Sequence, residues 1–147
     1  NFEVDVLGPV RAVEVVMPHM EEQGSGSIVL ISTTSAGEAM GGPQAYNAMK
    51  ASLITWGKQL ALHHGRNGVR VNVVSPGPIE FEGGNWDMIK GTMEKFYNSQ
   101  LRQHPAGRLG KPEEVARCIV FLASPAAEWC NGSNLVVDGA YTNRTQF

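Results

Sequence analysis

Three short apolar segments alternate with helical patterns along this chain. They lie at residues 28–31, 69–74 and 135–137, are rich in valine and isoleucine, and are too short to be helices. The first is apolar at every position, which is typical of a strand buried on both faces. Because helical patterns separate the three segments, the strands are expected to pair in parallel through crossover connections. We therefore predict an α/β fold with a parallel sheet and flanking helices.

Four stretches carry helical patterns. Apolar residues recur at helical spacing over residues 8–22 and 44–64, and a less regular helix is predicted from Trp86 onward. A proline followed by two glutamates opens the stretch 112–123. Proline and acidic residues suit a first helical turn, where N–H groups lack acceptors and the helix dipole is positive.

Composition excludes several classes of partner. The chain has 147 residues, 42% apolar and 18% charged, with a formal net charge of −2, which suits a soluble globular domain. This charge gives no reason to expect nucleic acid or an anionic membrane as a partner. No apolar run is long enough to cross a bilayer, and the start of the chain carries no secretory signal pattern. We expect a cytosolic protein without a metal site.

Two distinctive short segments follow the first two predicted strands. A hydroxyl cluster occupies residues 32–35 after the first strand, and a Pro-Gly turn, Pro76-Gly77, follows the second. The carboxyl ends of parallel strands share one edge of a sheet, and ligands of such sheets bind there. Both segments are therefore expected at one rim.

Tyr46 and Lys50 form a candidate proton-transfer pair. They are four residues apart on a predicted helix and so share a face. A free phenol has a pKa of about 10, and a nearby ammonium lowers it. A hydroxyl on the preceding loop could hold a substrate oxygen while Tyr46 exchanges the proton. This chemistry requires a hydride acceptor beside the pair.

Several ordered motifs, spread over nearly the whole chain, resemble those of the short-chain dehydrogenase/reductase family. The matching segments are residues 4–20, 27–35, 46–51, 69–77, 107–116, 121–124 and 137–139. The resemblance implies a Rossmann-like, doubly wound sheet, NAD or NADP as cofactor and a small alcohol or carbonyl compound as substrate. It also implies a homodimer or homotetramer in which the helices at residues 8–22 and 44–64 pack against a partner.

The resemblance also implies roles for individual residues. Tyr46 would be the general acid/base, and Lys50 would lower its pKa and hydrogen-bond the nicotinamide ribose. The segment 80–104 would cover the substrate, with Trp86 as a candidate contact. Residues lining the nicotinamide would be Pro76, Gly77 and Ile79.

The catalytic hydroxyl, usually a serine in the family, is ambiguous in this chain. Thr33 lies thirteen residues before Tyr46, at the family's usual separation, and we favour it. Thr34 instead stands in the family's Ser-x-Ala-Gly frame, completed by Ser35 and the two residues after it. Thr34 and Ser35 remain alternatives and candidate substrate contacts.

Asp5 occupies the place where the family often has a catalytic asparagine. It could keep a hydrogen-bonding role while adding negative charge near Lys50, which would oppose phenolate formation at Tyr46. The alternative is an ordinary helix N-cap.

A glycine-rich phosphate turn, which opens the first strand-helix unit of dinucleotide-binding folds, is absent from the sequence. Residues 1–147 are therefore expected to be the C-terminal catalytic part of a single dinucleotide-binding domain, without the half that holds the cofactor phosphates. The leading functional hypothesis is a nicotinamide-dependent oxidoreductase. The alternative is a non-catalytic or truncated relative that serves as a binding or assembly module.

Overall fold

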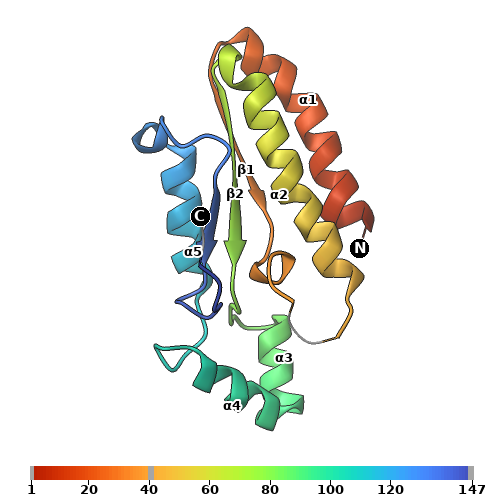
Figure 1. Ribbon diagram of the computed structural model, residues 1–147, viewed down its shortest axis with the longest axis vertical. Helices are drawn as coiled ribbons and strands as arrows, with labels where there is room; N and C mark the ends of the chain where they lie inside the picture. The colour runs from red at the N-terminus through yellow and green to blue at the C-terminus, as the bar shows by residue number, and fades with distance from the viewer. Residues whose placement is uncertain (1, 40–41, 146–147) are drawn as a thin grey trace.

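The computed structural model of the protein describes residues 2–39 and 42–145 (Figure 1). The helices and strands are α1 (Gly8–Glu22), β1 (Gly26–Ile31), α2 (Ala45–His64), β2 (Val69–Pro76), α3 (Asn85–Thr92), α4 (Glu94–Gln103), α5 (Pro112–Ala123) and β3 (Asn134–Val137). A π-helical turn, Glu3–Leu7, leads into α1, and a 3₁₀ turn, Thr34–Ala36, follows β1.

The three strands form a parallel sheet in the order β1-β2-β3. Ile31 of β1 lies opposite Val74, and Val137 of β3 lies opposite Pro76. The connection from β1 to β2 passes through α2, and the connection from β2 to β3 passes through α3, α4 and α5. The predicted α/β fold with a parallel sheet and crossover connections is therefore confirmed.

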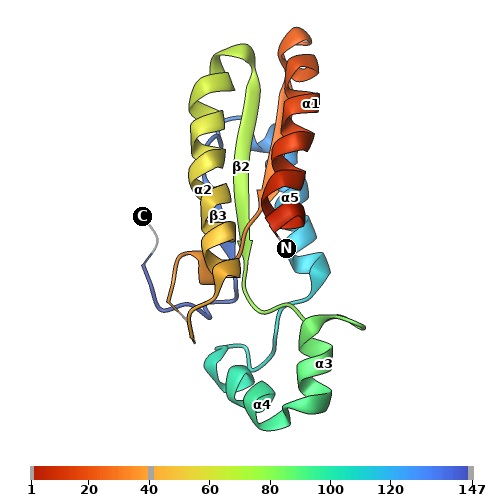
Figure 2. The same ribbon diagram turned by 90° about the vertical axis from the view of Figure 1, so that its right-hand side faces the viewer.

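Helices cover both faces of the sheet. Figures 1 and 2 show α1 and α2 on one face and α5 on the other. Successive strand residues point to opposite faces, so β2 contributes Val71 and Val73 to the core beneath α1 and α2, and Val74 to the core beneath α5. The sheet is thereby fixed as the middle layer.

Two sequence-based expectations were wrong in detail. Strand β1 is not buried on both faces: Leu30 is buried, but Ile31 is 40% exposed. The reason is that β1 pairs with only one neighbour, β2, within the described residues. The helix predicted from Trp86 onward is two helices, because Met93 leaves the helical conformation at φ −133° and ψ 51°.

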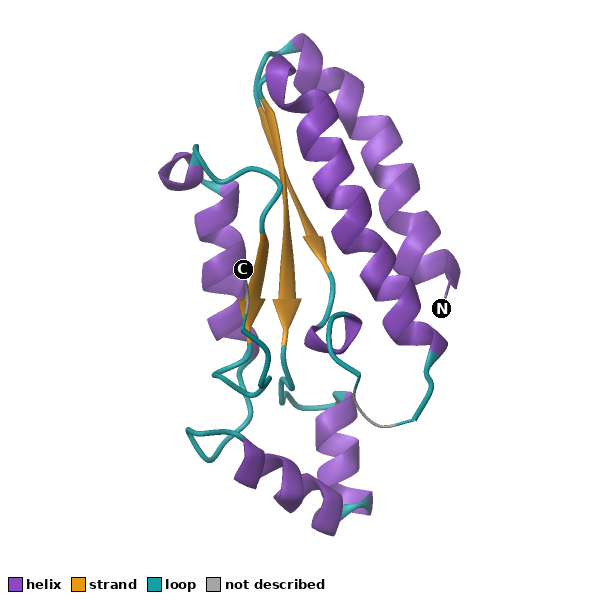
Figure 3. Cartoon of the chain, viewed as in Figure 1, coloured by secondary structure: helices purple, strands orange, loops and turns teal. Residues whose placement is uncertain are grey.

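All three strands point toward the same end of the molecule. Their carboxyl ends face the region of α3 and α4, and α2 begins at this end before running back along the sheet (Figure 3). The start of α2, which carries Tyr46, therefore lies close to the loop that follows β1.

Candidate active site

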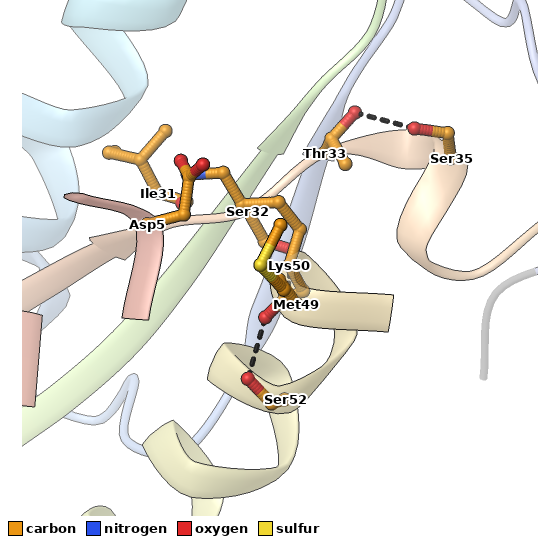
Figure 4. Close-up of polar contacts among 8 residues, drawn as sticks. All are labelled: Asp5, Ile31, Ser32, Thr33, Ser35, Met49, Lys50 and Ser52. Atoms are coloured by element: carbon orange, nitrogen blue, oxygen red, sulfur yellow. Dashed lines mark hydrogen bonds and ion pairs between the residues drawn. The ribbon is translucent and has the colours of Figure 1, made fainter. Parts of the chain in front are cut away.

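Lys50 joins three elements at the carboxyl rim. Its Nζ lies 3.1 Å from Oδ1 of Asp5, and it donates to the carbonyl oxygen of Ile31 at 3.2 Å (Figure 4). The side chains of Lys50 and Asp5 are only 13% and 16% exposed. The ammonium is thus held between the π-helical turn, the end of β1 and helix α2.

Ser32 fixes α2 against the strand ends. Its backbone N–H donates to the carbonyl oxygen of Val74 at 2.8 Å, which continues the ladder beyond β1. Its hydroxyl donates to the backbone carbonyl of Lys50, also at 2.8 Å. Because Ser32 is buried, these bonds are shielded from water and position Lys50 relative to the sheet.

Asp5 is not a helix N-cap. It lies inside the π-helical turn Glu3–Leu7, whose N-cap is Phe2, and α1 has Leu7 as its N-cap. The N-cap interpretation is therefore wrong. Single π-helical turns frequently occur at functional sites, and this one places the Asp5 carboxylate on Lys50.

The phenol of Tyr46 is half-buried beside this ion pair. The residue is 39% exposed, and the Lys50 Nζ lies 5.9 Å from the centroid of its ring. Burial, followed by the negative charge of Asp5, raises the pKa of Tyr46 above its ordinary value. The lowering expected from Lys50 is not seen, because burial disfavours the charged phenolate and the Asp5 carboxylate adds an opposing negative charge.

The three candidate hydroxyls differ in exposure. Thr33 is partly exposed, and its Oγ1 lies 3.1 Å from Oγ of Ser35. Figure 4 shows these two side chains meeting on the loop after β1. Thr34 is only 3% exposed, inside the 3₁₀ turn. Thr33 and Ser35 are therefore accessible to a small molecule, whereas Thr34 is packed inside.

The turn after β2 directs the backbone groups of one residue, Ile79, away from its bridge partner. Gly110 donates to the carbonyl of Pro78 at 3.0 Å and accepts from the N–H of Glu80 at 2.9 Å, forming a parallel bridge centred on Ile79. In extended backbone, neighbouring residues direct their polar groups to opposite sides. The N–H and carbonyl of Ile79 therefore point away from Gly110 and form a donor–acceptor pair.

Close packing requires glycine at position 77. Its N–H donates to the carbonyl of Val137 at 3.0 Å, and an added Cβ would lie 2.7 Å from the Cβ of Asp138. The Pro-Gly turn is therefore held tightly against the end of β3.

Helices α3 and α4 are attached to the rim through Glu80, a residue that the sequence analysis did not single out. Its carboxylate accepts from Lys90 of α3 at 2.8 Å and from the hydroxyl of Tyr97 of α4 at 2.6 Å. The hydrogen bonds from Lys90 and Tyr97 hold the pKa of Glu80 below its ordinary value. No short sequence motif predicts this cluster, because its members are distributed over residues 80–97.

Trp86 serves first as a packing residue between α3 and α4. Its ring stacks on that of Phe96, with centroids 6.1 Å apart and an interplanar angle of 11°. Its role as a substrate contact stays a prediction.

A concavity of about 520 Å³ borders the site without containing it. It is lined by residues of the loop after β1 and the start of α2, including Ser35, Gln44 and Asn47. Thr33, Tyr46 and Lys50 are not among the residues that line it. The candidate site is therefore defined by the contacts of Lys50 and Tyr46 rather than by this cavity.

Comparison with known proteins identifies the family. A family model described as enoyl-(acyl carrier protein) reductase matches residues 1–142. The chain is 38% identical over 148 aligned residues to isoepoxydon dehydrogenase of Aspergillus clavatus, covering 100% of this chain and 57% of the relative. The chain belongs to the short-chain dehydrogenase/reductase family.

Two further members of the short-chain dehydrogenase/reductase family extend the comparison. The 3-oxoacyl-[acyl-carrier-protein] reductase of Thermotoga maritima is 39% identical, over 94% of this chain and 54% of the relative. A crystal structure of gluconate 5-dehydrogenase from Burkholderia cenocepacia, in complex with NADP and tartrate, superimposes with a TM-score of 0.85 at 28% identity, over 97% of this chain and 55% of the other. The chain thus spans about half the length of the relatives it matches.

Membrane-spanning helices and metal-binding clusters are both absent from the described residues. No helix within residues 2–39 and 42–145 has the length and apolar character needed to span a membrane. Within the same ranges, no three or more His, Cys, Asp or Glu side chains are grouped so that they could hold a metal ion.

Proposed function

We propose that this chain carries the proton-transfer half of an NAD- or NADP-dependent oxidoreductase acting on an alcohol/carbonyl pair. One observation carries the proposal: Tyr46, Lys50 and Asp5 meet at the carboxyl rim of a parallel sheet, next to the loop that carries Thr33. This rim is where open α/β sheets bind their ligands.

Tyr46 exchanges the proton. In the reductive direction its hydroxyl donates a proton to the substrate oxygen, and in the oxidative direction its phenolate accepts the proton of the alcohol. Thr33 holds the same oxygen through its partly exposed hydroxyl, supported by Ser35 at 3.1 Å. A bound nicotinamide would supply or accept the hydride. The raised pKa of Tyr46 keeps the phenol protonated at neutral pH, which suits proton donation to a carbonyl.

Lys50 and the turn after β2 are the groups suited to hold the nicotinamide end of the cofactor. The outward N–H and carbonyl of Ile79 match the acceptor and donor of a carboxamide. Pro76 and Gly77 supply the wall beside it, and Lys50 is the candidate donor to the ribose. The phosphates would need groups beyond those assigned to this site.

The substrate is a small molecule that fits between the loop after β1 and the α3–α4 region. The relatives supply a first panel: isoepoxydon, gluconate and a 3-oxoacyl-acyl carrier protein, each tested with both nicotinamide cofactors. The proposal predicts a change in NAD(P)H fluorescence on binding to the natural-length protein, and turnover of at least one member of the panel. A natural-length protein that binds neither NADH nor NADPH would contradict it and favour a binding or assembly role.

We also propose that the protein is a cytosolic homo-oligomer. Val15 of α1 is 67% exposed and Leu62 of α2 is 71% exposed, which would suit helix faces that pack on a second copy. Cys118 and Cys130 are free, and reduced thiols suit the cytosol. Light scattering on the purified natural-length protein tests the oligomer, and a monomer at micromolar concentration would contradict it.

A further inference from the structure

The segment that follows β3 lies between two parts of the candidate site. It runs beside the loop that follows β1, at the carboxyl rim (Figure 2). Asp138 shapes its first turn: one carboxylate oxygen accepts from the N–H of Ala140 at 3.0 Å, and the other accepts from the N–H and hydroxyl of Thr142 at 2.9 and 2.7 Å. The segment therefore has a defined conformation where it leaves the sheet.

One part of this segment is buried against the end of α4. The hydroxyl of Tyr141 donates to the side-chain oxygen of Gln100 at 2.5 Å, and its ring stacks on that of His104 with centroids 4.4 Å apart. His104 in turn interacts through Nδ1 with the backbone carbonyl of Gln100 at 2.9 Å. All three residues are more than nine-tenths buried. Tyr141 thus ties the segment to α4.

A later part of the segment contacts the loop that carries the candidate hydroxyls. Arg144 donates to the carbonyl oxygen of Gly37 at 2.7 Å. A Cβ added to Gly37 would overlap the guanidinium of Arg144, so the two groups are in direct contact. The φ of Gly37 is −120°, which any residue adopts. Space for Arg144, rather than backbone conformation, is therefore what favours glycine at this position.

We propose that residues 138–144 act as a strut that fixes the loop 33–37 relative to α4, with Arg144 as a positioning residue for the hydroxyl of Thr33. The strut contacts the loop through Arg144 and α4 through Tyr141. Both the loop and α4 border the space assigned to the substrate, so the strut sets its width. That the strut holds the loop 33–37 in place follows from these contacts alone. That it affects substrate turnover rests on the proposed function.

Amide hydrogen exchange on the natural-length protein tests whether the strut holds the loop 33–37 in place. Arg144→Gln removes a charged hydrogen bond, so the amides of Ala36 and Gly37, which close the 3₁₀ turn, should exchange about tenfold faster. Arg117→Gln, an exposed arginine on α5, is the matched control and should leave them unchanged. If the amides of Ala36 and Gly37 exchange at the same rate in the wild type and in Arg144→Gln, the proposed strut is refuted.

A double-mutant cycle isolates the contact. Gly37→Ala should loosen the loop in the wild type, because its methyl group displaces the guanidinium, but should add little in the Arg144→Gln background. Additive effects of the two substitutions on exchange would contradict a direct contact between the two positions.

Steady-state kinetics distinguish a failure of the strut proposal from a failure of the proposed function. If the enzyme turns over substrate, Arg144→Gln should raise the substrate KM or lower kcat severalfold while the cofactor KM stays unchanged, and Arg144→Lys should recover part of the loss. Wild-type kinetics in Arg144→Gln would overturn the catalytic consequence of the strut. A wild type that binds no nicotinamide cofactor would refute the proposed function, while the exchange result would still decide whether the strut exists.

Discussion

Asp5 controls the charge at the centre of the site. A carboxylate, where many relatives are expected to carry a neutral amide, pairs with Lys50 at 3.1 Å and contributes to the raised pKa of Tyr46. The phenol is therefore a better proton donor than proton acceptor at neutral pH.

Asp5→Asn should reverse part of this effect. The amide keeps hydrogen-bonding capacity but removes the negative charge, so the pKa of Tyr46 falls. The pH profile of kcat/KM for alcohol oxidation should consequently move to lower pH. Glu3→Gln, which removes a charge from the same π-helical turn without a described contact to Lys50, is the control. Coincident profiles for the wild type and Asp5→Asn would refute the role of Asp5.

The same assay can distinguish the roles of Thr33 and Thr34. Thr33→Ala should lower kcat/KM by about a hundredfold, because it removes the partly exposed hydroxyl that we propose holds the substrate oxygen, and Thr33→Ser should retain most of the activity. Thr34→Ala should instead lower the melting temperature, since Thr34 is 3% exposed. Equal, near-wild-type activity in both alanine variants would remove the threonines from the mechanism.

At the scale of elements, Glu80 couples the turn after β2 to both α3 and α4. Glu80→Gln should weaken the bonds from Lys90 and Tyr97, so that the two helices cover the substrate less tightly. We expect the substrate KM to rise by about tenfold, the ratio that corresponds to losing one hydrogen bond to a charged group. Glu82→Gln, at an exposed neighbouring position, should match the wild type. An unchanged substrate KM in Glu80→Gln would argue that α3 and α4 do not cover the substrate.

The start of α5 carries a pH-dependent contribution to stability. Hydrogen bonds from Arg108 and from the N–H of Lys111 lower the pKa of Glu114 from 4.5 to about 2. A carboxyl whose pKa is lowered by folding stabilises the native state fully above its unfolded-state pKa, and the effect disappears as the pH falls through the folded-state pKa.

The melting temperature of Glu114→Gln should therefore lie below that of the wild type at pH 7. The difference should shrink as the pH falls from 4.5 towards 2. A difference that does not vary with pH would show that the charge of Glu114 is not the cause.

At the scale of the whole molecule, local signals predicted most of the architecture. The period of apolar residues located α1, and a proline with two glutamates located the start of α5, because both features act within one helix. Parallel pairing followed from the alternation of strands and helices. The Tyr46–Lys50 pair was visible because its members are one helical turn apart.

Other features depend on contacts between distant segments, which no local pattern encodes. The Glu80 cluster and the contact of Arg144 with Gly37 arise from how α3, α4 and the segment after β3 meet the rim. The expected lowering of the Tyr46 pKa failed for a related reason: the spacing of Tyr46 and Lys50 reveals their proximity, but not how far the folded chain buries the phenol. The resemblance had already placed the negative charge of Asp5 near Lys50, where it acts in the same direction as burial.

The central claim is that Tyr46 transfers the proton in a nicotinamide-dependent reaction. The most direct measurement compares Tyr46→Phe with the wild type in single-turnover oxidation of bound NADH or NADPH, followed by fluorescence, in the presence of a carbonyl substrate. Phenylalanine keeps the ring but removes the hydroxyl. We expect cofactor binding within about twofold of the wild type and a rate lowered by at least about a hundredfold. A Tyr46→Phe protein that oxidises the cofactor at the wild-type rate would contradict it.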